Sequence, residues 1–285
     1  MQLKQAVDAA YQLFIENDVP SPRLNAELLM MFVLGRERAY LFAHPERELN
    51  CEEQAQYNDV VRERASGCPT QYIIGHQEFW GLDLLVSPAV LIPRPETEHV
   101  IETVLALVNE YRHEGPSRLR LLDVGTGSGC IALALASELP HIEIHACDIS
   151  EEALEVARIN AARLALGGRV LFRKSDLLNV YAGERFDFVI SNPPYVGEAD
   201  ADKVQKQVRE FEPRIAVFSG EEGLDIYRKL VPQAHEHLRA GGWFVAEIGF
   251  SEEAKIRRLL KDWQDVQVTA DLQGIPRVVA ARKRS

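Results

Sequence analysis

Five consecutive residues, Ser191-Asn192-Pro193-Pro194-Tyr195, form a polar corner directly after an apolar run. Two successive prolines fix φ and remove two backbone donors, so the carbonyls of Asn192 and Pro193 stay out of a helix and can accept hydrogen bonds. Asn192 adds a side-chain carbonyl, and Tyr195 adds a flat ring that could cover a planar group held between these acceptors. The corner therefore suits an NH2 group.

An amide or aryl amine is a poor nucleophile because its nitrogen lone pair is delocalised. Two acceptors that hold its hydrogens can turn that lone pair towards an electrophile. The alternative is an ordinary proline-rich turn after a strand, with Tyr195 as packing. The neighbouring motifs favour the chemical interpretation.

A glycine-rich loop, residues 125–129, separates the apolar run 119–124 from a helical pattern at 130–135. The glycines let the backbone approach a ligand closely, and the N–H groups at the helix start favour a carboxylate or phosphate. A dinucleotide loop would need glycine at position 130, which is Cys130. The pattern D-x-G-x-G-x-G, which begins at Asp123, looks instead like a loop that binds S-adenosylmethionine.

A second predicted strand, 141–146, ends at Cys147-Asp148, and an acid at this place can accept both hydroxyls of a ribose. The alternative for Asp148 is an ordinary acid at a helix start. A later strand, 186–190, delivers Asn192 to the same sheet edge, since the carboxyl ends of parallel strands meet there. Cofactor and NH2 group are thus expected to converge.

Around these motifs, the chain has 285 residues, of which 46% are hydrophobic, and a formal net charge of −11. This is enough for one large α/β domain and a smaller one. The negative charge disfavours a protein that grips a phosphate backbone. The four cysteines show no zinc spacing, so no metal is predicted, and the lack of a long apolar run or signal peptide predicts a cytoplasmic protein.

The N-terminal region carries helical periodicity, and we predict four helices there, at 2–16, 24–34, 37–43 and 52–65. Up to Gly75 it has seven Lys and Arg against eleven Asp and Glu, which suits docking of a protein better than clamping of DNA. Residues 1–75 are therefore expected to form a helical substrate-docking domain.

From Tyr72 to Val86 the chain is rich in β-formers interrupted by Gly75 and Gly81, which predicts a hairpin. We place a β-hairpin linker at 76–94 and the large α/β domain, with the glycine loop and the polar corner, at 95–285. Further strands are expected at 243–248, 266–270 and 277–281, with a helix at 223–238.

Taken together, these motifs resemble those of Rossmann-like S-adenosylmethionine-dependent methyltransferases that act on amino or amide nitrogen. Three further stretches resemble the release-factor glutamine methyltransferases, called PrmC or HemK, and extend the resemblance over the whole chain: Phe79-Trp80-Gly81, Pro93-Arg94-Pro95-Glu96-Thr97-Glu98 and Phe211-Glu212-Pro213. The resemblance implies an α/β fold, a Rossmann-like class I methyltransferase sheet with a small N-terminal helical bundle and a β-hairpin linker.

The resemblance also implies roles for individual residues. S-adenosyl-L-methionine, with S-adenosyl-L-homocysteine as product, would contact Gly125, Thr126, Gly127, Ser128, Gly129, Asp148, Leu177 and Asn192. Within this set the glycine loop would hold the methionine end, Asp148 the ribose, and Leu177 would border the adenine. Asn192 and the Pro193 carbonyl would hold the glutamine amide hydrogens, Pro194 would stiffen the corner, and Tyr195 would pack on the amide plane.

The implied reaction is methylation of the glutamine side-chain amide in the Gly-Gly-Gln motif of peptide chain release factors, which supports translation termination. The partner would be the release factor, with no direct binding of nucleic acid or membrane, and we expect a monomer. Three alternatives stay open: a ribosomal-protein glutamine methyltransferase, an adenine-amino DNA methyltransferase, and a nonenzymatic cofactor-binding adaptor. The first two share the Asn-Pro-Pro-Tyr motif.

Overall fold

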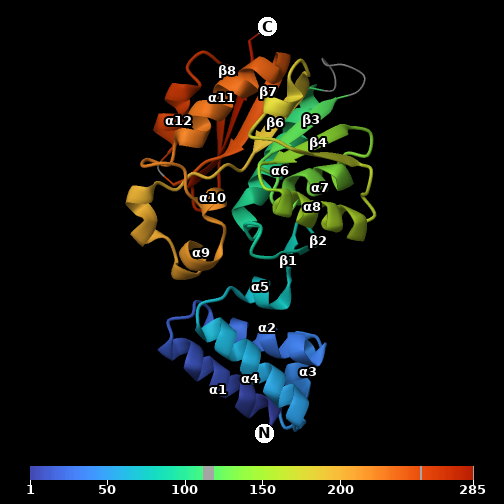
Figure 1. The fold of residues 1–285 in the computed structure, drawn as a ribbon, viewed down its shortest axis with the longest axis vertical. Helices are drawn as coiled ribbons and strands as arrows, with labels where there is room; N and C mark the ends of the chain where they lie inside the picture. Colours follow the sequence, from blue (N-terminus) through green and yellow to red (C-terminus); the bar gives the residue numbers. More distant parts are fainter. Residues whose placement is uncertain (112–118, 251, 285) are drawn as a thin grey trace. The chain divides into compact units, whose positions relative to one another are not determined.

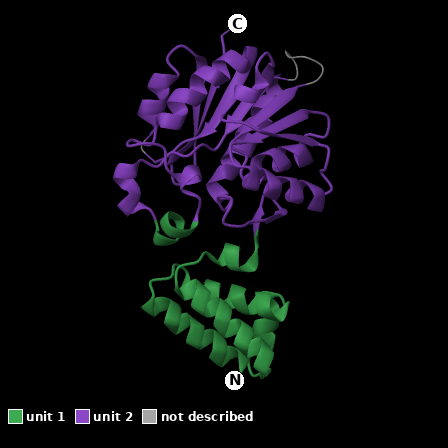
Figure 2. Ribbon diagram, in the orientation of Figure 1, with its two compact units in different colours: residues 1–76, 205–211 green, residues 77–204, 212–285 purple. Residues whose placement is uncertain are grey.

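The computed structural model describes residues 1–111, 119–250 and 252–284. The chain divides into two compact units, which Figure 2 distinguishes by colour. Unit 1 comprises Met1–His76 together with Gln205–Phe211, and unit 2 comprises Gln77–Val204 with Glu212–Ser285. Unit 1 is therefore built from two stretches far apart in the sequence.

Unit 1 is helical. Its helices are α1 (Leu3–Glu16), α2 (Pro22–Leu34), α3 (Arg38–Ala43), α4 (Cys51–Ala65), α5 (Thr70–Ile74) and α9 (Lys206–Phe211). The large side chains Phe14, Leu29, Met30 and Tyr57 are buried in one core, and the Tyr57 hydroxyl donates to the Ala26 carbonyl at 2.9 Å. The four helices predicted for this region are confirmed.

The β-hairpin begins at His76, the first residue of the predicted linker 76–94. Ile73 and Ile74 belong to the short helix α5, so the strand interpretation of Tyr72 to Ile74 is wrong. Gly75 ends this helix in the left-handed region, and the strands β1 (His76–Phe79) and β2 (Leu82–Leu85) follow. Trp80 and Gly81 both have positive φ, 54° and 70°, as a tight two-residue hairpin turn requires.

Unit 2 contains a seven-stranded sheet with the order β5-β4-β3-β6-β7-β9-β8 (Figure 1). The strands are β3 (Arg120–Val124), β4 (Glu143–Asp148), β5 (Val170–Lys174), β6 (Phe186–Ser191), β7 (Leu238–Glu247), β8 (Gln264–Ala270) and β9 (Pro276–Arg282). The first five strands in this order are parallel, and β9 and β8 complete the sheet in antiparallel fashion.

Two hydrophobic clusters cover the two faces of the sheet, since neighbouring strand residues point to opposite sides. Leu121, Phe188 and Val245 belong to one cluster, whereas Leu122 and Val189 belong to the other. Helices α6 (Glu98–Tyr111), α7 (Cys130–Glu138) and α8 (Glu151–Arg163) contribute to the first, and α11 (Asp225–His237) and α12 (Glu253–Leu259) to the second. The result is a three-layer α/β sandwich, as the sequence predicts.

The strand order reverses between β3 and β6, and this position determines where a ligand can bind. In an open α/β sheet, the loops on either side of such a point diverge and leave a crevice at the carboxyl ends of the strands. The glycine loop follows β3, and the Asn192 corner follows β6. In the described part of the chain, none of the helices combines the length and hydropathy needed to cross a membrane.

Candidate active site

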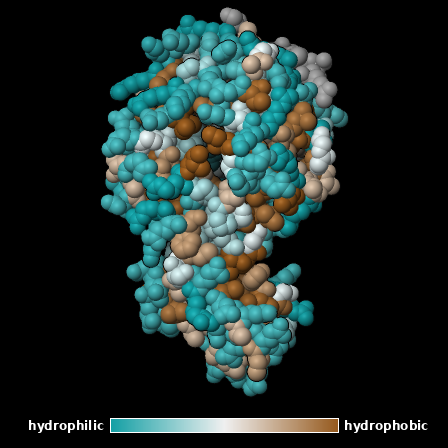
Figure 3. Space-filling model, viewed as in Figure 1, coloured by the Kyte–Doolittle hydropathy of each residue, from teal (hydrophilic) through white to brown (hydrophobic). Residues whose placement is uncertain are grey.

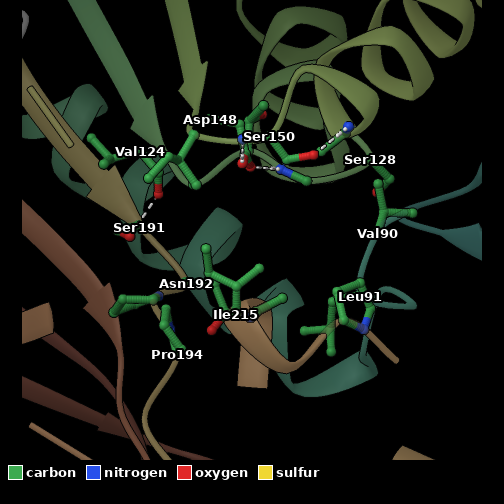
Figure 4. A pocket seen from close by; sticks show the side chains of 18 of the residues that line it. Val90, Leu91, Val124, Ser128, Asp148, Ser150, Ser191, Asn192, Pro194 and Ile215 are labelled. Carbon is green, nitrogen blue, oxygen red and sulfur yellow. Dashed lines mark hydrogen bonds between the residues drawn. The ribbon is translucent and has the colours of Figure 1, made fainter. Parts of the chain in front are cut away.

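A cavity of unit 2 lies at this point of the sheet. Hydrophobic side chains gather around a hollow in unit 2 in the space-filling view (Figure 3). The cavity brings together most of the predicted site residues, namely Gly125, Thr126, Gly127, Ser128, Asp148, Leu177, Asn192, Pro193 and Pro194. Figure 4 shows Asp148 and Asn192 across the cavity from one another. Gly129 and Tyr195 do not line it.

The glycine loop turns because two of its amides are held by the neighbouring strand. Gly125 and Thr126 donate to the Cys147 carbonyl at 2.8 and 2.9 Å. Gly125 and Gly127 have positive φ, and a Cβ added at either would meet no atom within 4 Å. No side chain covers the backbone at these two positions, and the space next to it is open, so a ligand can approach the main chain closely.

Gly129 serves a different purpose at the start of α7. A Cβ there would lie 3.0 Å from the Leu133 side chain and 3.2 Å from Ala157, so glycine allows α7 and α8 to pack closely. A contact of Gly129 with the cofactor stays a prediction. On the same helix α8, the fully buried Asn160 donates to the Ser128 carbonyl at 2.9 Å and thereby fixes the loop.

Asp148 ends β4 with its carboxylate at the cavity. Its two oxygens accept hydrogen bonds from the backbone amides of Gly127 (2.9 Å) and Ser150 (3.0 Å). Burial raises the pKa of this carboxyl group, and the backbone amides oppose the shift by stabilising the anion. Each oxygen keeps lone-pair capacity for a further donor such as a hydroxyl group.

Asp123 lies one residue before the end of β3 and is buried beside the same loop. One of its oxygens accepts a hydrogen bond from the Thr126 hydroxyl at 2.6 Å, and the other has no partner among the described residues. Burial, with a smaller contribution from the charge of Asp148, raises the pKa of Asp123 to about 7. The Ser128 hydroxyl is likewise buried without a partner in the described chain. Polar atoms of this kind are satisfied by a ligand or by water.

Leu177 lines the cavity in a left-handed conformation with φ of 50°. Its carbonyl accepts a hydrogen bond from the buried Cys147 thiol at 3.3 Å, which ties this loop to the end of β4. Its side chain is partly buried against the cluster of the second sheet face. An apolar wall is therefore present where the sequence predicts the adenine border.

The acceptor corner is fixed at its first residue, where the Ser191 hydroxyl donates to the Val124 carbonyl at 2.7 Å and joins β6 to β3 (Figure 4). Asn192 follows, and its Nδ2 donates to the Thr97 hydroxyl at 3.1 Å. Tyr195 is not among the residues that line the cavity, and its hydroxyl donates to Glu247 Oε1 at 3.1 Å. Packing of Tyr195 on a substrate amide stays a prediction.

The sequence predicts no role in the site for two residues of this region, although Thr97 belongs to the stretch from Pro93 to Glu98 that carries the family resemblance. Thr97 and Glu247 are buried and bonded to each other, with the Thr97 hydroxyl donating to Glu247 Oε2 at 2.6 Å. One signal was available: Glu247 is a carboxylate at the end of an apolar strand, as are Asp123 and Asp148.

The segment from Ala89 to Thr97 supplies another wall of the cavity. Glu212 holds it, because its buried carboxylate accepts the Ile92 backbone amide at 3.2 Å and pairs with the Arg94 guanidinium. Two motifs more than a hundred residues apart, around Arg94 and Glu212, thus meet. Within residues 1–111, 119–250 and 252–284, no group of three or more His, Cys, Asp or Glu side chains is arranged to hold a metal ion.

Comparison with known proteins places both units in families. The family model of the PrmC N-terminal domain matches residues 5–75, and the model of the methyltransferase small domain matches residues 104–211.

Curated relatives match over the full length. The chain is 56% identical over 285 residues to the release factor glutamine methyltransferase of Koribacter versatilis (strain Ellin345), with 99% of each chain covered. It is 39% identical over 282 residues to the protein of that name from Geobacter sulfurreducens, covering 98% of this chain and 96% of the relative.

Solved structures share the fold at lower identity. The catalytic domain of hMettl16, in complex with MAT2A 3′UTR hairpin 6, aligns with a TM-score of 0.57 and 19% identity over 78% of this chain and 81% of that one. The human methyltransferase 10 domain containing protein aligns with a TM-score of 0.52 and 19% identity over 82% and 98% of the two chains. These neighbours establish the class I methyltransferase fold.

Proposed function

Since this chain belongs to the release factor glutamine methyltransferase family, we propose that it methylates the glutamine side-chain amide in the Gly-Gly-Gln motif of peptide chain release factors. S-adenosyl-L-methionine is the methyl donor, and the reaction supports translation termination. Membership in this family confirms the resemblance drawn from the sequence.

One observation carries the proposal. The glycine loop with Asp148 and the corner with Asn192 line the same cavity, from opposite sides of the point where the strand order reverses. A methyl donor held by the first group and an amide held by the second would therefore meet inside one cavity, which suits direct transfer between them.

The residues present fit the methyl donor. The exposed backbone at Gly125 and Gly127 and the Ser128 hydroxyl, which has no partner among the described residues, would contact its methionine end. Asp148 would accept the ribose hydroxyls, and Leu177 would border the adenine. When bound, S-adenosylmethionine supplies an electrophilic methyl group on a positively charged sulfur.

The chain's own contribution to transfer is to hold the acceptor. Asn192 Oδ1 and the Pro193 carbonyl would accept the two hydrogens of the glutamine NH2 group, which directs its lone pair out of the amide plane. The amide nitrogen attacks as a neutral group, so no strong base has to remove a proton beforehand. A proton on this nitrogen becomes acidic once the methyl group has been added, and it can leave after the transfer. Orientation by Asn192 and the rigid prolines is thus the main demand on the site.

A methylation assay with four acceptors tests the proposal. Purified protein and isotopically labelled S-adenosylmethionine are incubated with a release factor, with the same factor carrying Gln→Ala in its Gly-Gly-Gln motif, with a ribosomal protein and with DNA. We expect label in the intact release factor alone, on the motif glutamine. Preferred labelling of the ribosomal protein or of DNA would overturn the substrate assignment, and no label in any acceptor would favour an adaptor.

A further inference from the structure

A chain of hydrogen bonds joins the acceptor corner to the carboxyl end of β7. Asn192 Nδ2 donates to Thr97 Oγ1 at 3.1 Å, and Thr97 Oγ1 donates to Glu247 Oε2 at 2.6 Å. The other carboxylate oxygen accepts the Tyr195 hydroxyl at 3.1 Å. Glu247 therefore holds the corner at both ends, residue 192 through Thr97 and residue 195 directly.

The direction of these bonds determines which way the Asn192 amide faces. A threonine hydroxyl has a single hydrogen, and that of Thr97 is directed to Glu247 Oε2. Burial raises the pKa of Glu247, and the hydrogen bonds from the Thr97 and Tyr195 hydroxyls oppose this shift because they stabilise the ionised carboxylate, which can only accept. Towards Asn192, Thr97 therefore presents a lone pair. The NH2 end of the Asn192 amide must face Thr97, and its carbonyl oxygen must point the other way.

The reversed orientation is unfavourable because the Asn192 oxygen would then oppose the Thr97 oxygen with no hydrogen between them. Water cannot easily relieve that repulsion, since Thr97 and Glu247 are 1% and 2% exposed. Packing adds to the constraint at Tyr195, because a Cβ at Gly249 would lie 2.8 Å from its ring. Glycine at 249 thus leaves room for the ring beside Glu247.

We propose that Thr97 and Glu247 are positioning residues for methyl transfer, which keep the Asn192 carbonyl oxygen directed at the substrate amide. The inference deepens the proposed function and rests on it. The site must present hydrogen-bond acceptors to the NH2 group of the substrate amide. If the Asn192 amide were flipped, its own NH2 group would face the substrate NH2 group, and both groups are donors. Thr97 and Glu247 thereby make the corner selective for an amide nitrogen through the orientation of Asn192.

Variants of Thr97 separate this role from a merely structural one. Thr97→Val keeps the shape of the side chain and removes the hydroxyl, whereas Thr97→Ser keeps the hydroxyl. We expect Thr97→Val to lower the single-turnover rate of transfer to a release factor by about 10-fold to 100-fold, as misoriented reactants do, with little change in affinity for S-adenosylmethionine. Thr97→Ser should restore most of the rate.

Thr103→Val is the matched control, because the Thr103 hydroxyl on α6 bonds to the His99 carbonyl at 2.7 Å and to the Thr269 hydroxyl at 3.3 Å, and among the described residues it forms no hydrogen bond with Asn192. Its transfer rate should equal that of the unmodified chain. A Thr97→Val rate within about twofold of the unmodified chain, or equal losses in Thr97→Val and Thr97→Ser, would overturn the proposal. Should Thr97→Val not fold, Glu247→Gln serves instead, since its NH2 group can donate to Thr97 and free the threonine hydrogen to face Asn192.

The orientation can also be observed without turnover, which distinguishes failure of this inference from failure of the proposed function. In ¹⁵N-labelled protein, the Asn192 NH2 signal, assigned by its loss in Asn192→Ala, should show slow hydrogen exchange in the unmodified chain and fast exchange in Thr97→Val. Equal exchange in both would refute the role of Thr97 whatever the substrate is. An unmodified chain that protects this group but methylates no release factor would refute the substrate alone.

Discussion

Three buried or partly buried carboxylates stand at or next to the carboxyl ends of parallel strands of the sheet, Asp123 on β3, Asp148 on β4 and Glu247 on β7. They are chemically alike, and their hydrogen bonds distinguish them. Asp148 accepts two backbone amides and faces the cavity, Glu247 accepts two side-chain hydroxyls behind the acceptor corner, and Asp123 accepts one hydroxyl beside the glycine loop. In the proposed mechanism, the strand that carries each carboxylate thus separates cofactor binding at Asp148 from acceptor positioning at Glu247.

Asn192→Ala should abolish most methyl transfer while it spares the fold and the affinity for S-adenosylmethionine. Loss of one preorganised acceptor commonly costs about 100-fold to 1000-fold in rate. Asn192→Asp should be slow as well, because the added charge attracts the sulfonium but repels the lone pairs of Thr97. Single-turnover kinetics and calorimetry with each variant test this, and a near-normal rate for Asn192→Ala would contradict the acceptor mechanism.

Asp123 should make the ligand-free protein less stable as pH rises. Its pKa in the folded chain is about 7, above the value of about 4 for an unfolded aspartate, so the folded protein binds the extra proton between these values. The stability that this proton contributes is complete below pH 4 and is lost as pH rises through 7. Asparagine at position 123 cannot titrate. The free energy of unfolding of Asp123→Asn, relative to that of the unmodified chain, should therefore rise by a few kcal/mol as pH rises across this range.

Urea unfolding at half-unit steps from pH 5 to pH 8 measures the effect. The matched control is Asp59→Asn, because Asp59 is exposed on α4. The unfolding free energy of this variant should run parallel to that of the unmodified chain. If the free energy of unfolding of Asp123→Asn also ran parallel to that of the unmodified chain from pH 5 to pH 8, burial would not retain a proton on Asp123.

At the scale of elements, the sequence predicts most helices and strands of both units, because their apolar periodicity matches their burial. It fails at α5, where two isoleucines favour a strand by composition but follow Pro69 and end at the left-handed Gly75, so the short helix depends on its context. The glycine loop, Asp148 and the corner were recognisable because each follows an apolar strand. The pairing of Thr97 with Glu247 was not, since hydrogen bonds across 150 positions leave no local pattern.

The wall formed by residues 89–97 depends on an asymmetric ion pair. The Glu212 side chain is fully buried, whereas that of Arg94 is 29% exposed. Arg94→Ala leaves a buried carboxylate with the Ile92 amide as its remaining described partner and should lower the free energy of unfolding by about 3 kcal/mol. Glu212→Gln should cost less, because its amide oxygen still accepts from Ile92 and Arg94 can reach water. Chemical denaturation of both variants checks the order, and the reverse order would contradict this account.

At the scale of the whole molecule, unit 1 incorporates α9, which lies in the sequence shortly after the acceptor corner. Arg64 Nη2 donates to Gln207 Oε1 at 2.8 Å, and the Phe211 ring lies 3.1 Å from the place of a Cβ at Gly67. The corner of unit 2 is thus followed, within ten residues, by a segment that packs on the N-terminal helices.

Deletion of residues 1–75 should therefore separate chemistry from recognition. The cavity is lined by unit 2 alone, so the truncated chain should bind S-adenosylmethionine with nearly unchanged affinity and methylate a short peptide that contains Gly-Gly-Gln. Transfer to an intact release factor should lose about 10-fold to 1000-fold in kcat/KM, as expected if docking contributes about 1.4 to 4 kcal/mol. Because the deletion exposes Phe211, the same truncation with Phe211→Ala controls for aggregation. Equal kcat/KM for intact release factor with and without residues 1–75 would refute a docking role for unit 1.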